Sequence, residues 1–266
     1  MNKIKNYKIA SAFIRKNCLE QSSIKSTAHL GSCLSIVDIL SVIYLGFLKL
    51  KPWKDRDIFI LSKGHAALAL YSTLLYKKIL TKKNINSFAS SNSIFEEHPN
   101  LSIKGVEAST GSLGHGLPIG CGYAYSFNKL RKQKKKVIVL LSDGECNEGS
   151  VWEAAMFASA KTLNNLTVIV DYNKWQATDR SNQVLDLKSL KDKWGAFNWD
   201  VIEIDGHNFT ELELALKKKH NRPKAIIANT IKGKGVSIME DDNNWHYKSP
   251  NEEELTLALE EVLNEK

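Results

Sequence analysis

The chain has 266 residues, of which 43% are hydrophobic and 25% are charged, and it carries a formal net charge of +8. These values predict one globular domain over residues 1–266 and exclude a low-complexity or disordered protein. No apolar run is long enough to span a membrane, and residues 1–7 lack the apolar core and cleavage site of a signal peptide. We therefore expect a cytoplasmic protein that does not act at a membrane.

Periodic apolar positions predict alternating helices and strands along the chain. The expected helices cover residues 4–25, 35–48, 66–77, 114–131, 151–163, 187–197, 210–219 and 251–263. The expected strands cover residues 57–61, 137–141, 167–171, 199–204 and 224–229. Ser32 or Ser35 is the candidate cap of the second helix. This alternation predicts an α/β fold, with a doubly wound, mostly parallel sheet and helices on both faces.

The most informative segment is the βαβ unit over residues 137–175. Two short β-branched runs flank an Ala-rich helix, a pattern typical of buried parallel strands joined by a crossover. Asp143 follows the first strand and Asn173 the second, so both are expected at the edge where open α/β sheets bind ligands. Alone, each residue is more typical of an ordinary turn or cap. Together, a carboxylate and an amide oxygen suit a hard cation such as Mg²⁺, and Gly144 leaves room for a phosphate.

The run from Ser142 to Trp175 resembles the thiamine diphosphate motif, in which Gly-Asp-Gly is followed by Asn about thirty residues later. The fuller string Asp-Gly-Glu-Cys-Asn-Glu-Gly-Ser-Val-Trp-Glu-Ala resembles transketolase in particular. The resemblance implies a thiamine diphosphate-binding fold in which Asp143, Asn173 and the carbonyl of Trp175 ligate Mg²⁺, with Ca²⁺ or Mn²⁺ as substitutes. The chain departs from the family at Ser142, where the family usually has Gly.

Histidine segments in the family's order extend the resemblance over nearly the whole chain. The matching segments are residues 26–32, 61–67, 97–99, 105–116, 232–235 and 245–246. A single histidine is more typical of a surface or a core, but the ordered set is specific. The resemblance implies that His29, His98 and His246 surround the reacting carbons of the substrate, where imidazoles can move protons near neutral pH.

The remaining site residues follow from the same resemblance. His65, Lys232 and His246 are expected to supply donors or positive charge to the diphosphate. The loop with Gly111, Ser112 and Leu113 is expected to touch the aminopyrimidine. Glu148 matches a glutamate involved in communication between the two active sites of the family dimer. It is equally suited to complement the dipole of the helix that follows it.

This chain is less than half as long as a full transketolase, whose second domain supplies the glutamate that activates the cofactor and the groups that hold the sugar phosphate. The resemblance therefore implies an N-terminal subunit that works with a separate C-terminal subunit, as a heterotetramer, on sugar phosphates. The implied reaction moves a two-carbon ketol unit from a ketose phosphate to an aldose acceptor, as in the pentose phosphate pathway. Two alternatives stay open: a carboligase dedicated to an unusual sugar, and a non-catalytic cofactor-binding partner.

The densest basic run, residues 131–136, is typical of a solvated helix end, where cations complement the helix dipole. No interleaved aromatic residues or nucleic-acid motif accompany this run, so we expect no nucleic-acid partner. A basic surface also favours the recruitment of anionic sugar phosphates. The four cysteines lack metal-ligand spacing, and Cys18, Cys33 and Cys121 are expected in the core.

Overall fold

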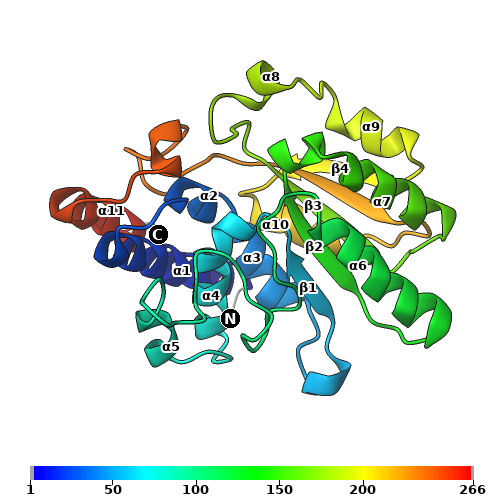
Figure 1. Ribbon diagram of the computed structural model, residues 1–266, viewed down its shortest axis with the longest axis horizontal. Coiled ribbons are helices and arrows are strands. Elements are labelled where there is room, and N and C mark those ends of the chain that lie inside the picture. Colours follow the sequence, from blue (N-terminus) through cyan, green and yellow to red (C-terminus); the bar gives the residue numbers. More distant parts are fainter. Residues whose placement is uncertain (1–2, 265–266) are drawn as a thin grey trace.

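A computed structural model describes residues 3–264. Both ends of the expected 1–266 domain, and the first two residues of the 1–7 segment that was searched for a signal peptide, lie outside the described residues. Its centre is one five-stranded sheet in the order β1-β2-β3-β5-β4 (Figure 1). The strands are β1 Ile58–Leu61, β2 Val137–Ser142, β3 Leu166–Tyr172, β4 Asp200–Asp205 and β5 Lys224–Asn229. Every pairing is parallel, and the three central strands are buried almost throughout, as their continuous apolar runs predict.

Helices cover both faces of this sheet (Figure 1). The α-helices are α1 Lys3–Lys25, α2 Leu30–Ser35, α3 Val37–Val42, α4 Ala67–Tyr76, α5 Lys82–Asn86, α6 Gly116–Tyr125, α7 Gly149–Ala160, α8 Ser181–Val184, α9 Leu190–Ala196, α10 Phe209–Lys217 and α11 Glu252–Asn264. The tighter or wider turns are η1 Ile43–Phe47, η2 Trp53–Asp55, η3 Gly64–Ala66, η4 Ser126–Leu130, η5 Gly144–Asn147 and η6 Asn243–His246. One core joins the sheet to α1–α4, α10 and α11, and the other joins it to α6, α7 and α9. The predicted α/β fold is therefore confirmed.

The helix expected over residues 35–48 is interrupted. The chain bends at Ile36 between α2 and α3, and the last turn is the π-helical η1. Ser32 and Ser35 do not cap it, because both lie inside α2, and the residue before α2 is His29. The short helices α5 and α8 were not predicted either.

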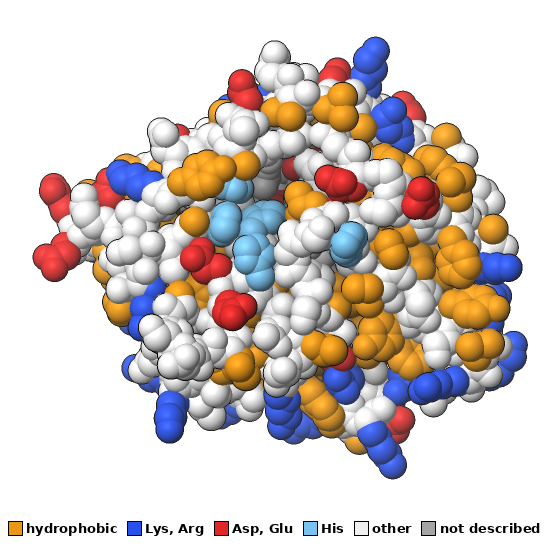
Figure 2. All heavy atoms as spheres, in the orientation of Figure 1, with side chains coloured by type: hydrophobic (Ala, Val, Ile, Leu, Met, Phe, Trp, Pro, Cys, Tyr) orange, Lys and Arg blue, Asp and Glu red, His pale blue; other side chains and the backbone are white. Residues whose placement is uncertain are grey.

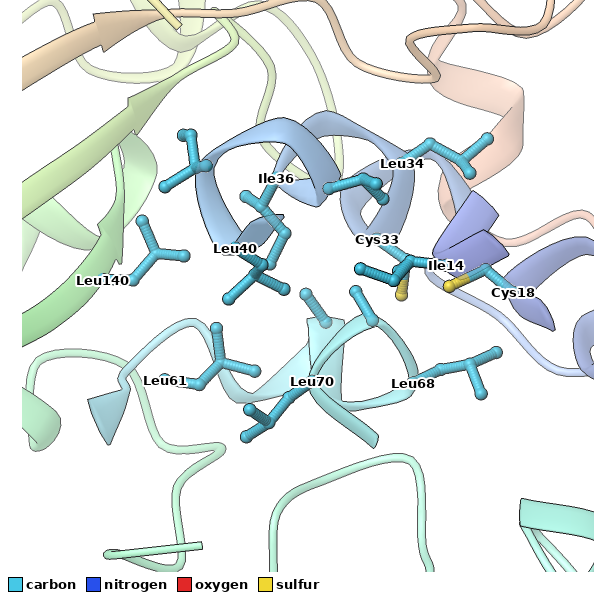
Figure 3. Close-up of a cluster of buried hydrophobic side chains, with 14 of the residues drawn as sticks. Ile14, Cys18, Cys33, Leu34, Ile36, Leu40, Leu61, Leu68, Leu70 and Leu140 are labelled. Carbon is cyan, nitrogen blue, oxygen red and sulfur yellow. The ribbon is translucent and has the colours of Figure 1, made fainter. Parts of the chain in front are cut away.

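The core beneath α2 holds this bend in place. Figure 3 shows aliphatic side chains of α1, α2, α3 and α4 meeting Leu61 of β1 and Leu140 of β2. Cys18 and Cys33 belong to this core, and all four cysteines are free and buried. None of the helices in residues 3–264 is long and apolar enough to cross a membrane.

Candidate active site

The loops that follow four of the parallel strands converge at the carboxyl edge of the sheet. Lys63 and His65 follow β1, Asp143 follows β2, Asn173 follows β3, and Lys232 follows β5. Sequence reasoning predicted this edge because parallel strands place their carboxyl ends side by side. The order β1-β2-β3-β5 makes these four strands direct neighbours, so the loops that follow them lie side by side.

Asp143 and Asn173 lie together, as predicted for the two motif residues. One Asp143 carboxylate oxygen accepts from the backbone amide of Gly144 at 2.9 Å, and the other accepts from the amide of Lys174 at 3.0 Å. The hydroxyl of Ser181 also donates to Asp143, at 2.7 Å. The Asn173 side-chain oxygen accepts from the amide of Trp175 at 3.0 Å, which keeps the third predicted ligand residue in the same turn.

These residues fit a divalent cation. Asp143 is 2% exposed, and burial raises the pKa of its carboxyl to about 6, with the negative charge of Asp171 adding to this effect. A bound divalent ion would stabilise the carboxylate form. The donor set of a carboxylate and an amide oxygen is one that Mg²⁺ accepts. His29 Nδ1 and Gln176 Nε2 are also buried without a hydrogen-bond partner in the described chain, as expected where a polar ligand completes a site.

Four of the predicted histidines form one cluster beside these residues. The ring of His29 lies 5.5 Å from that of His65, 6.0 Å from that of His98 and 5.0 Å from that of His246, measured between ring centroids. Figure 2 shows histidine side chains gathered in a hollow of the surface. They come from four separate segments, and the backbone amide of His29 donates to the carbonyl of His246 at 2.6 Å.

Burial keeps three of these histidines, His29, His65 and His246, largely uncharged. It lowers the pKa of His29 to about 4, with the neighbouring His98 and Lys232 adding to the effect. Burial, followed by the charge of Lys232, lowers the pKa of His246 to about 3, and burial together with Lys63 holds the pKa of His65 well below its usual range. At neutral pH these three imidazoles can therefore accept protons or hydrogen bonds.

Lys232 and the loop at residues 111–113 border the histidines. The Lys232 ammonium is buried and lies 2.5 Å from Asn243 Oδ1 and 3.2 Å from His246 Nδ1. A side chain on Gly111 would come within 2.9 Å of the His98 ring, so this glycine allows His98 to reach its position. Ser112 is exposed and Leu113 is half-buried in the same loop.

Glu148 stands apart from the cluster. It is exposed at the start of α7, where its side chain makes no capping hydrogen bond. It packs beside Gly114, where any side chain would clash with it.

A buried ion pair that sequence reasoning missed supports the motif residues. Lys63 Nζ lies 2.5 Å from an Asp171 carboxylate oxygen, and both side chains are fully buried. The hydroxyls of Ser35 and Thr230 donate to Asp171 at 2.6 and 2.5 Å, and the Asn173 amide donates to it at 3.0 Å. This network fixes the rotamer of Asn173. No local sequence spacing predicts it, since its members come from four elements.

Glu145 is a second residue that was missed. Its buried carboxylate accepts from Ser62 Oγ, from the amide of Gly114 at 2.8 Å and from the amide of Ser142 at 3.3 Å. It therefore joins the loops after β1 and β2 to the loop that begins α6. The Ser-x-x-Glu spacing of residues 142–145 was the available signal.

The profile of the family described as "Transketolase, thiamine diphosphate binding domain" matches residues 7–262. The chain belongs to this family. It is 36% identical to an apulose-4-phosphate transketolase subunit of Phocaeicola vulgatus, over 93% of this chain and 90% of that protein. It is 35% identical to 6-deoxy-6-sulfo-D-fructose transketolase subunit SqwG of a Clostridium species, over 95% and 94% of the two chains. These transketolase relatives confirm the prediction of an enzyme of the split, N-terminal-subunit type.

Solved transketolases share the fold. The Campylobacter jejuni enzyme superposes with a TM-score of 0.88 at 28% identity, over 98% of this chain. This chain spans 43% of that protein, and it likewise spans 41% of human transketolase, to which it is 33% identical. It thus corresponds to one part of the longer transketolases and to nearly all of the split subunits.

Proposed function

We propose that the protein is the diphosphate-binding subunit of a split transketolase that transfers a two-carbon ketol unit from a ketose phosphate to an aldose acceptor. The observation that carries this proposal is the convergence of four histidines with Asp143 and Asn173 at one edge of the sheet. Residues 1–266 act as one domain in this proposal. The reaction belongs to carbohydrate metabolism in the cytoplasm.

The proposed cofactor-binding residues form two main groups, one that would bind the metal ion and one that would bind the diphosphate. Asp143, Asn173 and the carbonyl of Trp175 would ligate Mg²⁺, or Ca²⁺ or Mn²⁺ in its place. His65, Lys232 and His246 would donate hydrogen bonds to the diphosphate. Gly144, which has no side chain, would leave room for a phosphate group. Gly111, Ser112 and Leu113 would border the aminopyrimidine. Thiamine diphosphate supplies the nucleophilic carbon for breaking and forming the carbon–carbon bond next to a carbonyl.

The histidines would handle the substrate hydroxyls. Because burial keeps His29 and His246 neutral, each can accept a proton from a hydroxyl and return it within the same pocket. His98 lies edge-on to His29, with the ring centroids 6.0 Å apart. Glu97 Oε2 accepts from the amide of Ala28 at 3.2 Å and lies 3.5 Å from His29 Nδ1, without a hydrogen bond to it.

A C-terminal subunit would complete the site. The relatives are named as transketolase subunits, and this chain corresponds to less than half of the full-length enzymes. A heterotetramer would pair two such half-sites, and the exposed Glu148 would then lie where two copies communicate. The names of the relatives, one for a sugar phosphate and one for a sulfo sugar, also favour a specialised sugar over the substrates of the pentose phosphate pathway.

Reconstitution tests the proposal. The purified chain and its C-terminal partner, alone and mixed, would be assayed with thiamine diphosphate and Mg²⁺. The assay would follow transfer of the ketol unit from fructose 6-phosphate, apulose 4-phosphate or 6-deoxy-6-sulfofructose to an added aldose phosphate. We expect transfer only from the mixture. Transfer by the chain alone would refute the requirement for a second subunit. Cofactor binding by the mixture without transfer from any donor would instead support a non-catalytic cofactor-binding partner.

A further inference from the structure

A second concave surface lies at the opposite, amino-terminal edge of the sheet. It is a cleft of about 820 Å³ beside the starts of β2, β3 and β5. Its lining is strongly basic, and none of the described residues that line it is acidic. The lysines are Lys132, Lys134, Lys135, Lys136, Lys217, Lys218 and Lys219.

Most of this positive charge is not neutralised locally. Lys135 and Lys136 lie 4.0 Å from carboxylates of Asp55 and Asp57, and Lys217 pairs with Glu213. The ammonium groups of the other four lysines form no hydrogen bond or ion pair within residues 3–264; these four are Lys132, Lys134, Lys218 and Lys219. Cations gathered in a concave surface raise the local concentration of anions.

The positive charge of the cleft lysines also acts on Lys224, a buried lysine beneath the cleft. Lys224 Nζ donates to the carbonyls of Ala215, Leu216 and Lys218 at 2.8 to 3.1 Å, at the end of α10. Burial lowers the pKa of Lys224 to about 8, and the charges of Lys136 and Lys218 add to this effect. Lys224 thus holds the end of α10 closed, so that Lys217–Lys219 are presented on a fixed backbone.

The asparagine side chains in the wall of the cleft bond to one another and to nearby carbonyls. The Asn128 side-chain amide donates to the side-chain oxygen of Asn164 at 2.8 Å and to that of Asn165 at 3.2 Å. The Asn165 side-chain amide in turn donates to the carbonyls of Ala124 and Lys135 at 3.1 and 3.2 Å. The free donors of this surface are therefore the unpaired lysines. A ligand rich in acceptor oxygens is complementary to such a surface.

The aromatic side chains nearby are covered by lysines. Lys136 Nζ lies 4.0 Å from the centre of the Phe47 ring, and Lys135 Nζ lies 5.2 Å from that of Phe127. Single-stranded nucleic acids need free aromatic faces on which bases stack. The volume is also that of a small-molecule pocket. Both observations favour a compact anion over a nucleic acid.

We propose that this lysine cleft binds a small anion with several phosphate groups, an oligophosphate, at a site separate from the active site. The four unpaired lysines supply point charges for the phosphate oxygens. Since the cleft and the histidine cluster lie at opposite edges of the sheet, one ligand cannot occupy both.

Calorimetric titration with inorganic tripolyphosphate at 0.15 M salt tests this proposal. The cleft variant combines Lys132→Gln, Lys134→Gln, Lys218→Gln and Lys219→Gln. The control variant combines Lys82→Gln, Lys83→Gln, Lys191→Gln and Lys193→Gln, which removes the same charge from exposed positions outside the cleft. We expect at least tenfold weaker binding by the cleft variant and less than a twofold change in the control. Equal weakening in both variants, or in neither, would overturn the proposal.

Hydrogen exchange of the complete chain locates the bound anion. Tripolyphosphate should protect amides in residues 128–136 and 217–221. Protection confined to residues 143–175 and the histidine segments would mean that the anion binds only at the active site, and would refute the cleft. A single-stranded oligonucleotide that displaces tripolyphosphate, with the same dependence on the four lysines and tighter binding, would refute the choice of a small anion.

Discussion

Ser142 and Glu145 hold each other through a reciprocal pair of hydrogen bonds. Ser142 Oγ accepts from the amide of Glu145 at 3.2 Å, and Glu145 Oε2 accepts from the amide of Ser142 at 3.3 Å. This is the pattern of a capping box. Position 142 is the point where the chain departs from the family's usual Gly, and the pair shows that Ser is accommodated there by bonding to the turn that carries Asp143.

Replacing Ser142 by Ala should therefore destabilise the fold. The loss of one cap-type hydrogen bond typically costs about 1 kcal/mol of unfolding free energy. Urea unfolding would measure the change, with Ser102→Ala as the control because Ser102 is exposed on a loop. We expect less than about 0.5 kcal/mol for that control. Equal stability of Ser142→Ala and the unmodified chain would show that the Ser142 hydroxyl does not support the turn.

The Lys63–Asp171 pair gives a larger effect. In Lys63→Met the Asp171 carboxylate stays buried without its cation, which should cost about 3–5 kcal/mol of unfolding free energy. Adding Asp171→Leu should recover part of that loss, because no unpaired charge is left. The partly exposed pair Lys16–Glu20 is the comparison, and Lys16→Ala should cost less than about 0.5 kcal/mol. If Lys63→Met lost no more unfolding free energy than Lys16→Ala, the buried ion pair would not contribute to stability as proposed.

Asp143→Asn should remove Mg²⁺-dependent binding of thiamine diphosphate without unfolding the protein. Burial already disfavours the charged form of Asp143, so a neutral side chain of the same shape is tolerated. Titration of the reconstituted complex should show at least tenfold weaker cofactor affinity, and Asp192→Asn on the exposed face of α9 should leave it unchanged. Unaltered affinity in Asp143→Asn would count against the ligand assignment.

The histidine cluster should make the free protein sensitive to acid. The folded-state pKa values of His29 and His246, about 4 and about 3, lie below that of an unfolded histidine. The unfolded chain therefore binds more protons below pH 6.5, so stability that is complete above this pH is lost as pH falls towards 4. After allowance for solvent screening, each histidine should contribute on the order of 1 kcal/mol between pH 7 and pH 5.

Urea unfolding at pH 7, 6 and 5 would measure this loss. His29→Gln and His246→Gln should each flatten the dependence, whereas the exposed His115→Gln should not. If the unfolding free energy depends on pH as steeply in both variants as in the unmodified chain, His29 and His246 are not the source of the acid sensitivity. With thiamine diphosphate bound, the loss should begin at more acid pH, since an anion favours imidazolium and ligand binding stabilises the folded state.

The motif residues were predictable because their signal is local. Asp143 and Asn173 each follow a recognisable strand, and the histidines lie in short segments of fixed order. The sheet followed from apolar runs of the kind seen in β2 and β3. The parallel βαβ rule then placed Asp143 and Asn173 at one edge before any contact was known.

The supporting residues were not predictable, since their signal is only spatial. Asp171 sits within an apolar strand, and its partner Lys63 is 108 positions away in the sequence. The bend at Ile36 likewise has no Pro or Gly to mark it, and it places Ser35 against Asp171. Ser35 resembled a helix cap, but packing turned it inward.

The backbone of His29 is in a conformation that costs folding free energy. It has φ 69° and ψ 13°, a left-handed conformation that residues with a side chain seldom adopt. Gly or Asn at this position would relax the backbone while deleting an imidazole from the cluster. Random mutagenesis under selection for heat resistance alone should therefore enrich Gly or Asn at position 29. Selection for growth that depends on the proposed ketol transfer should remove these substitutions. If His29 has its proposed role, the two selections should act in opposite directions at this one position.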